Sequence, residues 1–228
     1  MLEGMVRSVE WQRVREFVLG APPHPAALAI TGEAGAGKST LWRAALEAAA
    51  DDGVRILRSV PSASEADMSF AGLSDLLDGV LPSVAGQLPA PQRDALEVAL
   101  LLRPAGEQPP TAHAVALGVL AAVRACAAAD RLLVAIDDVH WLDEASLDVL
   151  TFALRRITAP LSVLLAARTT APADPWTVGA PAPSHNWTDL LDAPTSAQRI
   201  ELSPLKPGQV QRLLPEKVSP ARVRQITE

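Results

Sequence analysis

A glycine-rich segment near the N-terminus constrains the fold of this chain more than any other feature. It reads Gly32-Glu33-Ala34-Gly35-Ala36-Gly37-Lys38-Ser39, follows the apolar run 26–30 and opens an alanine-rich helical stretch. This is the pattern of a phosphate-binding loop, whose backbone N–H groups wrap a polyphosphate and leave no room for side chains at the second and third glycines. Lys38 is placed to reach the β- and γ-phosphates, and the Ser39 hydroxyl to bind Mg²⁺. The alternative is a glycine-rich turn with a solvated lysine, which the flanking strand and helix disfavour.

A pair of acids follows a second apolar run. Residues 132–136 are continuously apolar, as is typical of a buried parallel strand, and Asp137 and Asp138 come directly after them. Ligands of open α/β sheets bind at the carboxyl ends of the strands. We therefore expect Asp137 to hold Mg²⁺, directly or through water, and Asp138 to orient or deprotonate an attacking water. Acidic pairs often simply begin a loop, and without the glycine-rich segment that interpretation would be preferred.

Composition narrows the classes of function. With 228 residues, 49% of them hydrophobic, the chain can bury the core of one α/β domain. The net charge of −6 and the scattered basic residues argue against direct DNA binding by this segment. The single Cys126 cannot form an internal disulfide, no signal-peptide pattern is present, and the apolar stretch 114–123 is too short to span a bilayer. We therefore expect a cytoplasmic protein without membrane insertion. The four histidines lack zinc-like spacing, which leaves Mg²⁺ as the expected metal.

The order of the expected elements predicts an α/β fold. It is that of a P-loop NTPase three-layer sandwich with a mostly parallel five-stranded sheet and a helical insertion between the second strand and the Walker B strand that ends at Asp137. Asp143 is expected to cap the helix that follows those acids. The expected strands are 26–30, 54–60, 132–136, 161–167 and 198–202, the expected helices are 9–19, 40–50, 70–80, 91–101, 112–128, 143–157, 207–214 and 220–227, and 169–190 is expected to be a surface loop. The expected divisions are an N-terminal helix and linker (1–25), an ATPase domain (26–202, with the insertion at about 61–130) and the start of a truncated helical lid (203–228).

Four segments resemble the ATPase domains of large bacterial regulators of the LuxR type, within the wider class of signal-transduction ATPases with numerous domains (STAND). The likeness covers most of the chain. Its most diagnostic piece is Ile136-Asp137-Asp138-Val139-His140-Trp141-Leu142-Asp143, and the others are 32–40, 69–77 and 164–168. The resemblance implies an ATP-binding switch with slow hydrolysis, whose output comes from a separate helix-turn-helix that this sequence does not contain.

The resemblance also implies roles for single residues. It assigns cofactor binding to the loop through Thr40 and to Arg7, which with Glu10 matches the family's N-terminal box, although Val6 stands where the family has glycine. It implies that the strand ending at Arg168 lies between the strand before the loop and the Asp137 strand, so that Arg168 emerges beside the γ-phosphate. Lys38, Asp138 and Arg168 are then the expected catalytic residues, with ATP or ADP and Mg²⁺ as cofactors.

Three functions remain open at this point. The first is a regulatory, weakly hydrolysing ATPase whose nucleotide state changes the docking of other domains or protomers. The second is a nucleotide-binding scaffold that does not hydrolyse. The third is a phosphotransferase, which would need an arginine-rich lid that the helical insertion does not offer. His140 and Trp141 could sense phosphate or pack beneath the loop, and core packing is favoured for Trp141.

Overall fold

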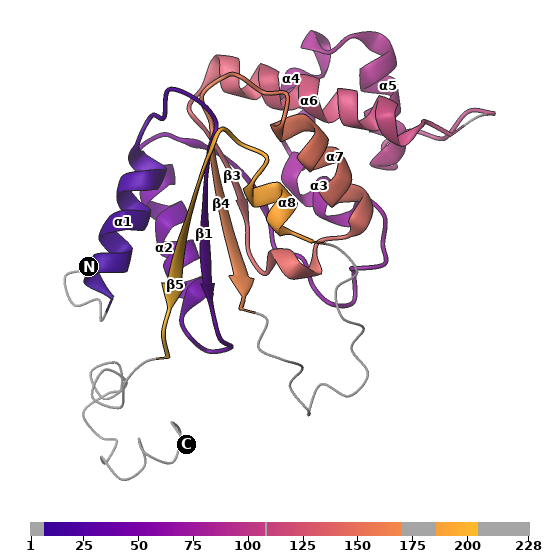
Figure 1. Ribbon diagram of the computed structural model, residues 1–228. Coiled ribbons are helices and arrows are strands. Elements are labelled where there is room, and N and C mark those ends of the chain that lie inside the picture. Colours follow the sequence, from indigo (N-terminus) through magenta and orange to yellow (C-terminus); the bar gives the residue numbers. More distant parts are fainter. Residues whose placement is uncertain (1–6, 108, 170–185, 205–228) are drawn as a thin grey trace.

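A five-stranded sheet forms the centre of the computed structural model, which describes residues 7–107, 109–169 and 186–204 (Figure 1). The strand order is β2-β3-β4-β1-β5, and every neighbouring pair is parallel. This confirms the expected α/β fold and the position of the Arg168 strand between the other two site strands. The strands are β1 (Ala26–Gly32), β2 (Arg55–Ser59), β3 (Leu132–Ile136), β4 (Ser162–Arg168) and β5 (Ser196–Leu202).

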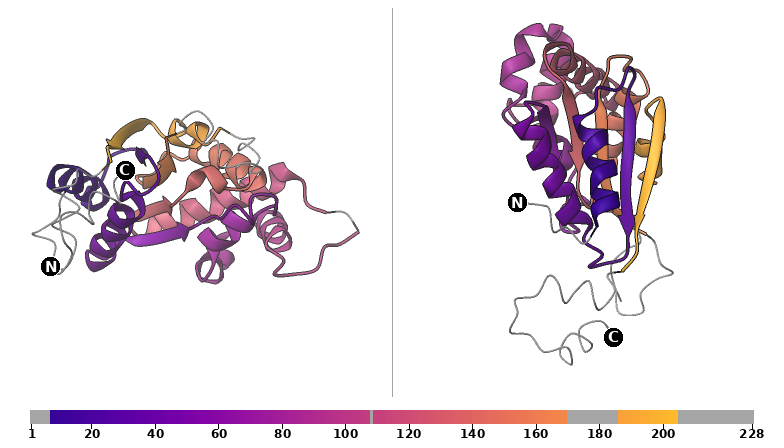
Figure 2. Two further views of the ribbon diagram at one scale, coloured as in Figure 1. Left: turned by 90° about the horizontal axis from the view of Figure 1, so that it is seen from below. Right: turned by 90° about the vertical axis from the view of Figure 1, so that its left-hand side faces the viewer.

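Helices cover both faces of the sheet and complete a three-layer sandwich (Figures 1 and 2). Two helices lie on one face, and the helices between β2 and β3 lie on the other with those after β3. The first layer contains α1 (Ser8–Leu19) and α2 (Lys38–Asp51), and the second contains α3 (Ala71–Leu77), α4 (Leu81–Val84), α5 (Ala90–Ala99), α6 (Ala112–Ala129), α7 (Glu144–Leu154) and α8 (Thr188–Leu191), with short 3₁₀ turns at Ala85–Gln87 and Val139–Trp141.

The apolar strands supply both cores at once. In β1, Leu28 and Ile30 pack in the core beneath α1 and α2, whereas Ala27 and Ala29 pack in the core beneath the other helices. Successive side chains of a strand point to opposite faces, so only a continuously apolar sequence can serve two covered faces. This is why the runs 26–30 and 132–136 lack the alternation of a half-exposed strand.

Most element boundaries agree with expectation to within two or three residues, and the differences have physical causes. The segment expected as one helix over 70–80 ends at Leu77, because Asp78, with ψ 132°, and Gly79, with a left-handed φ of 68°, form a turn that leaves the helix. Helix α7 ends at Leu154 and not near 157, although Ile157 is buried in the same core. The spacing of apolar residues there shows which side chains are buried, but it does not show whether the backbone is helical. The surface loop expected over 169–190 is described only at its ends, and the expectation is wrong at the C-terminal one, where helix α8 begins at Thr188 and Leu190 is buried in the core. The expected helices 207–214 and 220–227 lie outside the described residues.

Helix α6 corrects one expectation from the sequence. It is a single 18-residue helix with a mean hydropathy of 1.7, long and apolar enough to cross a membrane by these criteria alone. The expected helix over 112–128 agrees with α6, but its apolar stretch is longer than 114–123. In the fold, Val119, Val123 and Cys126 are buried in the core shared with α5 and α7. Helix α6 is apolar because it is the central helix of that layer and is packed against its neighbours.

Asp143 joins two helices of that layer. Its carboxylate caps α7 by accepting a hydrogen bond from the Ser146 N–H at 2.9 Å, as expected. It also accepts bonds from the N–H groups of Phe70 at 2.7 Å and Gly72 at 3.0 Å, at the start of α3. The residue is only 2% exposed. One buried carboxylate therefore satisfies donors at the N-termini of both helices, where helix dipoles favour negative charge.

Replacement of Asp143 by alanine should destabilise the fold. The change removes the cap of α7 and leaves the buried N–H groups at the start of α3 without partners, which together cost about 2–4 kcal/mol. Urea unfolding followed by circular dichroism measures this loss. Asp148→Ala, an equal change of charge at an exposed position of α7, is the matched control and should stay within about 0.5 kcal/mol of the parent. Equal stability of the two variants would contradict this role for Asp143.

Candidate nucleotide-binding site

The glycine-rich loop joins the end of β1 to the start of α2, and its glycines have distinct reasons to be there. Gly35 and Gly37 have φ values of 74° and 89°, in the left-handed region that favours glycine. At Gly32, an added Cβ would lie 2.6 Å from the carbonyl oxygen of Leu202 in the neighbouring strand. The backbone of the loop is thus free of side chains where a phosphate would approach, in front of the N-terminus of a 14-residue helix.

The other residues expected to bind the cofactor at the loop differ in how buried they are. Glu33 and Ala34 are exposed at its tip, and Thr40 is exposed on the first turn of α2. Ala36 is 2% exposed and packs in the core beneath α2, so only its backbone can face a ligand. Side-chain chemistry at the loop therefore comes from Lys38 and Ser39.

Lys38 lies within the loop that precedes it. The residue is 6% exposed, and its Nζ donates a hydrogen bond to the carbonyl oxygen of Glu33 at 2.8 Å. Burial lowers the pKa of the ammonium group, and the nearby Asp138 carboxylate partly opposes that shift. Lys38 forms no salt bridge with any described residue, so its positive charge is available to an anion held by the loop.

Ser39 and Asp137 connect the loop to the expected Walker B strand. The Ser39 hydroxyl donates a hydrogen bond to Oδ1 of Asp137 at 3.2 Å, and the same oxygen accepts the Asp138 N–H at 3.0 Å. Asp137 is 5% exposed, and this burial raises the pKa of its carboxyl group. A hydroxyl and a carboxylate in contact are hard oxygen donors of the kind that Mg²⁺ takes from a protein when water and phosphates supply its remaining ligands.

No described cluster offers a larger set of metal ligands. Within residues 7–107, 109–169 and 186–204, no group of three or more His, Cys, Asp or Glu side chains is placed to hold a metal ion. This suits a cation that is shared with a polyphosphate better than one in an all-protein cage.

Asp138 lies two residues beyond the end of β3. Its backbone is left-handed, with φ 43° and ψ 44°, and its side chain is 32% exposed. The nearest basic group is His140, whose Nδ1 is 3.9 Å from Oδ1 of Asp138. The His140 side chain is 8% exposed, burial lowers its pKa, and neither ring nitrogen has a hydrogen-bond partner among the described residues. The Asp138 carboxylate is therefore accessible, with a neutral imidazole beside it. The Trp141 ring lies 5.0 Å from that imidazole and is partly buried.

Arg168 is the last residue of β4, level with Gly32 in the parallel register. It is exposed, and its charge contributes to lowering the pKa values of both Lys38 and His140. The guanidinium therefore lies near Lys38 and His140. The structure brings together the three expected catalytic residues, which come from three different elements.

Arg7 reaches the same loop from the start of α1. Its Nε lies 3.9 Å from where a Cβ on Gly37 would stand, and its side chain is 11% exposed. Arg7 pairs with Glu10 at 3.5 Å and donates a hydrogen bond to the carbonyl oxygen of Ser203, just after β5. The contact with Ser203 was not expected, because nothing in the sequence links residues 196 positions apart.

Comparisons with known proteins identify a family for this chain. No curated protein sequence matches the chain. Among solved structures, the chain is similar to the Orc1 protein of Aeropyrum pernix in complex with DNA, with 15% identity, a TM-score of 0.47 and coverage of 97% of this chain. The chain spans about half of that protein, 55% of its length. Residues 5–166 match the AAA ATPase domain. That match covers most of the sequence and includes the loop, both acids and the start of α1, and the chain therefore belongs to the family of AAA ATPase domains.

Proposed function

We propose that this chain is the ATP-binding, slowly hydrolysing switch domain of a LuxR-type signal-transduction ATPase that acts in the cytoplasm. The observation that carries the proposal is the hydrogen bond between Ser39 and Asp137, which unites the loop with the acid of β3. The diagnostic run 136–143 supports the LuxR-type assignment, since it forms the end of β3, the acids and the cap of α7. Lys38, Asp138 and Arg168 supply the remaining charges.

The residues divide the work by their positions. The loop N–H groups and Lys38 would hold the phosphates, and Ser39 and Asp137 would hold Mg²⁺. Arg7, which lies near Gly37, would also bind the nucleotide. Bound Mg²⁺ would neutralise charge on the phosphates and make the terminal one easier to attack. Asp138, accessible beside a neutral imidazole, would accept the proton of a water. Arg168 would meet the charge of the γ-phosphate.

The contacts of Arg7 support a role as a switch. This side chain lies near Gly37 of the loop and donates a hydrogen bond to the backbone of Ser203, so one residue links the start of α1 and the neighbourhood of the loop to the residue that follows the last strand. A change in the loop on nucleotide binding would therefore reach both ends of the described chain. We propose that other domains or protomers of a larger regulator dock on these ends, and that this segment itself makes no direct contact with DNA.

One measurement separates this function from the two alternatives. The purified chain should be supplied with ATP and Mg²⁺, and the products identified by chromatography. Slow release of ADP and phosphate that stops with excess chelator supports the switch. Tight ATP binding without turnover would instead identify a scaffold, and a phosphorylated small molecule would identify a phosphotransferase.

Lys38→Ala should weaken binding of Mg-ATP by about 10- to 150-fold. The variant loses the charge within the loop, and a charge-assisted hydrogen bond of this kind contributes roughly 1.5–3 kcal/mol. Titration calorimetry measures the effect. Arg13→Ala, which removes one exposed positive charge from α1, should bind as the parent does. Parent-like affinity in Lys38→Ala would refute the assignment of the loop.

Asp137→Asn and Asp138→Asn should differ in phenotype. The first should weaken the Mg²⁺-dependent part of ATP affinity, because it removes a charged oxygen that contacts Ser39. The second should leave affinity nearly intact and slow turnover by about 10²- to 10⁴-fold, the usual contribution of a general base. Affinity with and without EDTA, and the single-turnover rate, separate the two effects. Turnover in Asp138→Asn equal to that of the parent would remove Asp138 from the mechanism.

Arg168→Ala should reduce the preference for ATP over ADP. A side chain directed at the γ-phosphate makes its bonds only when that group is present, so the loss is differential. At roughly 1.5–3 kcal/mol, the preference should fall by about 10- to 150-fold while ADP affinity is kept. Parallel titrations of both nucleotides test this, with Arg155→Ala, an exposed arginine after α7, as control. An equal loss for ATP and ADP would show that Arg168 does not sense the γ-phosphate.

A further inference from the structure

The sheet has an open edge at β2, away from the candidate nucleotide site. Strand β2 pairs with β3 on one side only, and no described strand lies on its other side. The Arg55 N–H donates to the Arg131 carbonyl, and the Ser59 carbonyl accepts the Asp137 N–H. Both bonds point toward β3. Because neighbouring residues of a strand direct their backbone groups to opposite sides, Ile56 and Arg58 direct theirs to the open edge.

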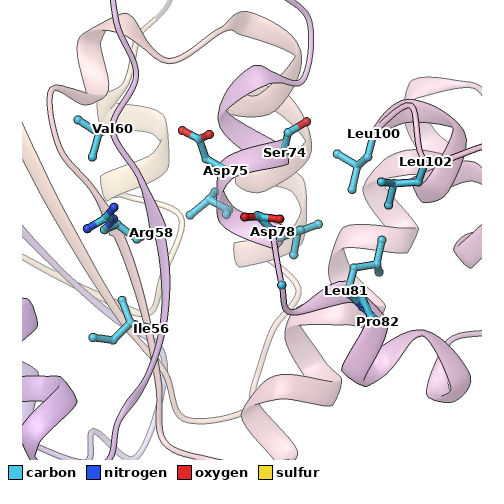
Figure 3. A pocket seen from close by; sticks show the side chains of 13 residues that line it. Ile56, Arg58, Val60, Ser74, Asp75, Asp78, Leu81, Pro82, Leu100 and Leu102 are labelled. Atoms are coloured by element: carbon cyan, nitrogen blue, oxygen red, sulfur yellow. The ribbon is translucent and has the colours of Figure 1, made fainter.

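A groove of about 600 Å³ runs along this edge, between β2 and helices α3 and α4 (Figure 3). Ile56 and Arg58 line it from the strand, and Val60 lines it from the position directly after the strand. No described residue provides a hydrogen-bond partner for their outward backbone groups. An unpaired row of this kind, beside an open groove, is a template for another extended chain.

The charges of the groove restrict what could bind. Asp75 and Asp78 lie on its α3 side and are both exposed. Asp75 accepts one hydrogen bond from Ser59 at 3.0 Å, whereas the carboxylate of Asp78 has no described partner. Arg58 is also exposed and forms no ion pair with a described residue. The α3 side therefore carries unneutralised negative charge.

Apolar side chains close the far end of the groove. Leu81, Leu100 and Leu102 line it there, and Leu102 is 63% exposed. The turn that presents Leu102 follows α5 and places Leu101 at a left-handed φ of 57°, where glycine usually stands at a helix end. Leu101 is 90% exposed. Two exposed leucines on a turn that is held in an unfavourable conformation for this residue form an apolar surface suited to a partner.

We propose that the β2 edge binds an extended segment of a partner protein, which adds a sixth strand to the sheet. Its backbone pairs with the outward groups of Ile56, Arg58 and Val60. Its alternate side chains are cationic and face Asp75 and Asp78, while the side chains between them are apolar and lie on the face of the sheet that carries Ile56. Only an extended backbone can satisfy donors and acceptors that recur at every second residue.

A peptide tests this proposal on the 228-residue chain without any measurement of ATP turnover. The probe is a nine-residue, end-blocked peptide in which lysine alternates with valine. On saturation, amide hydrogen exchange at Ile56, Arg58 and Val60 should slow by at least tenfold. Exchange at Leu57 and Ser59, whose backbone groups point toward β3, should not change. This alternation within one strand would not arise from binding at another face.

Two controls test the backbone and the charges separately. N-methylation of either the lysines or the valines should abolish binding in one peptide and spare it in the other, because only one set of N–H groups points toward β2. A peptide that alternates glutamate with valine, or the parent peptide with the variant Asp75→Asn/Asp78→Asn, should bind roughly tenfold more weakly.

Three results would overturn the proposal. The first is no binding of the lysine–valine peptide at millimolar concentration. The second is equal binding of the two N-methylated peptides, which would exclude strand addition. The third is a dimer in sedimentation experiments without peptide, with the same residues protected, which would make a second copy of this chain the occupant of the edge.

Discussion

The candidate site depends on the parallel pairing of β1 with β4 on one side and with β5 on the other, which holds the last residue of β1 between two strands. Gly32 lies level with Arg168 on one side and with Leu202 on the other, and the carbonyl oxygen of Leu202 leaves no space for a Cβ there. The chain can leave the sheet at this point only through glycine. The loop, the buried Lys38 and the start of α2 all follow from that exit, and the same register sets Arg168 beside them.

Much of this arrangement could be predicted from the sequence because its signals are local. The loop pattern, the apolar runs on either side of the acids and the cap at Asp143 each lie within a few residues of the structure that they specify. The alternation of two buried faces follows from apolar runs without polar interruption. The position of β4 in the sheet could not be predicted from local sequence. It was expected only because whole segments resemble a family with that strand order.

The features that could not be predicted depend on residues far apart in sequence. Arg7 meets Ser203, and Asp143 binds the N–H groups of Phe70 and Gly72, because the sheet brings their elements together. No periodicity or motif encodes such contacts. The helix boundaries missed near Gly79 and Ile157 have another cause, since apolar spacing reports which residues are buried and not whether the backbone remains helical. The open edge of β2 likewise could not be predicted, because it depends on the absence of a described strand beside β2, which no local pattern encodes.

Opposite charges buried at the carboxyl edge explain why this fold suits a charged ligand. Burial lowers the pKa of Lys38 and raises that of Asp137, because it disfavours the charged form of each group, so that ionisation of either one costs folding free energy. For Asp137, the stability that its raised pKa contributes is present only at low pH, and is lost as pH rises through the folded pKa. A phosphate beside Lys38 and a cation beside Asp137 would each favour the charged form. Mg-ATP carries both a negative and a positive charge, so its binding would offset the free-energy cost of ionising these two buried groups. For this, Lys38 would exchange its hydrogen bond to the Glu33 carbonyl for one to a phosphate oxygen.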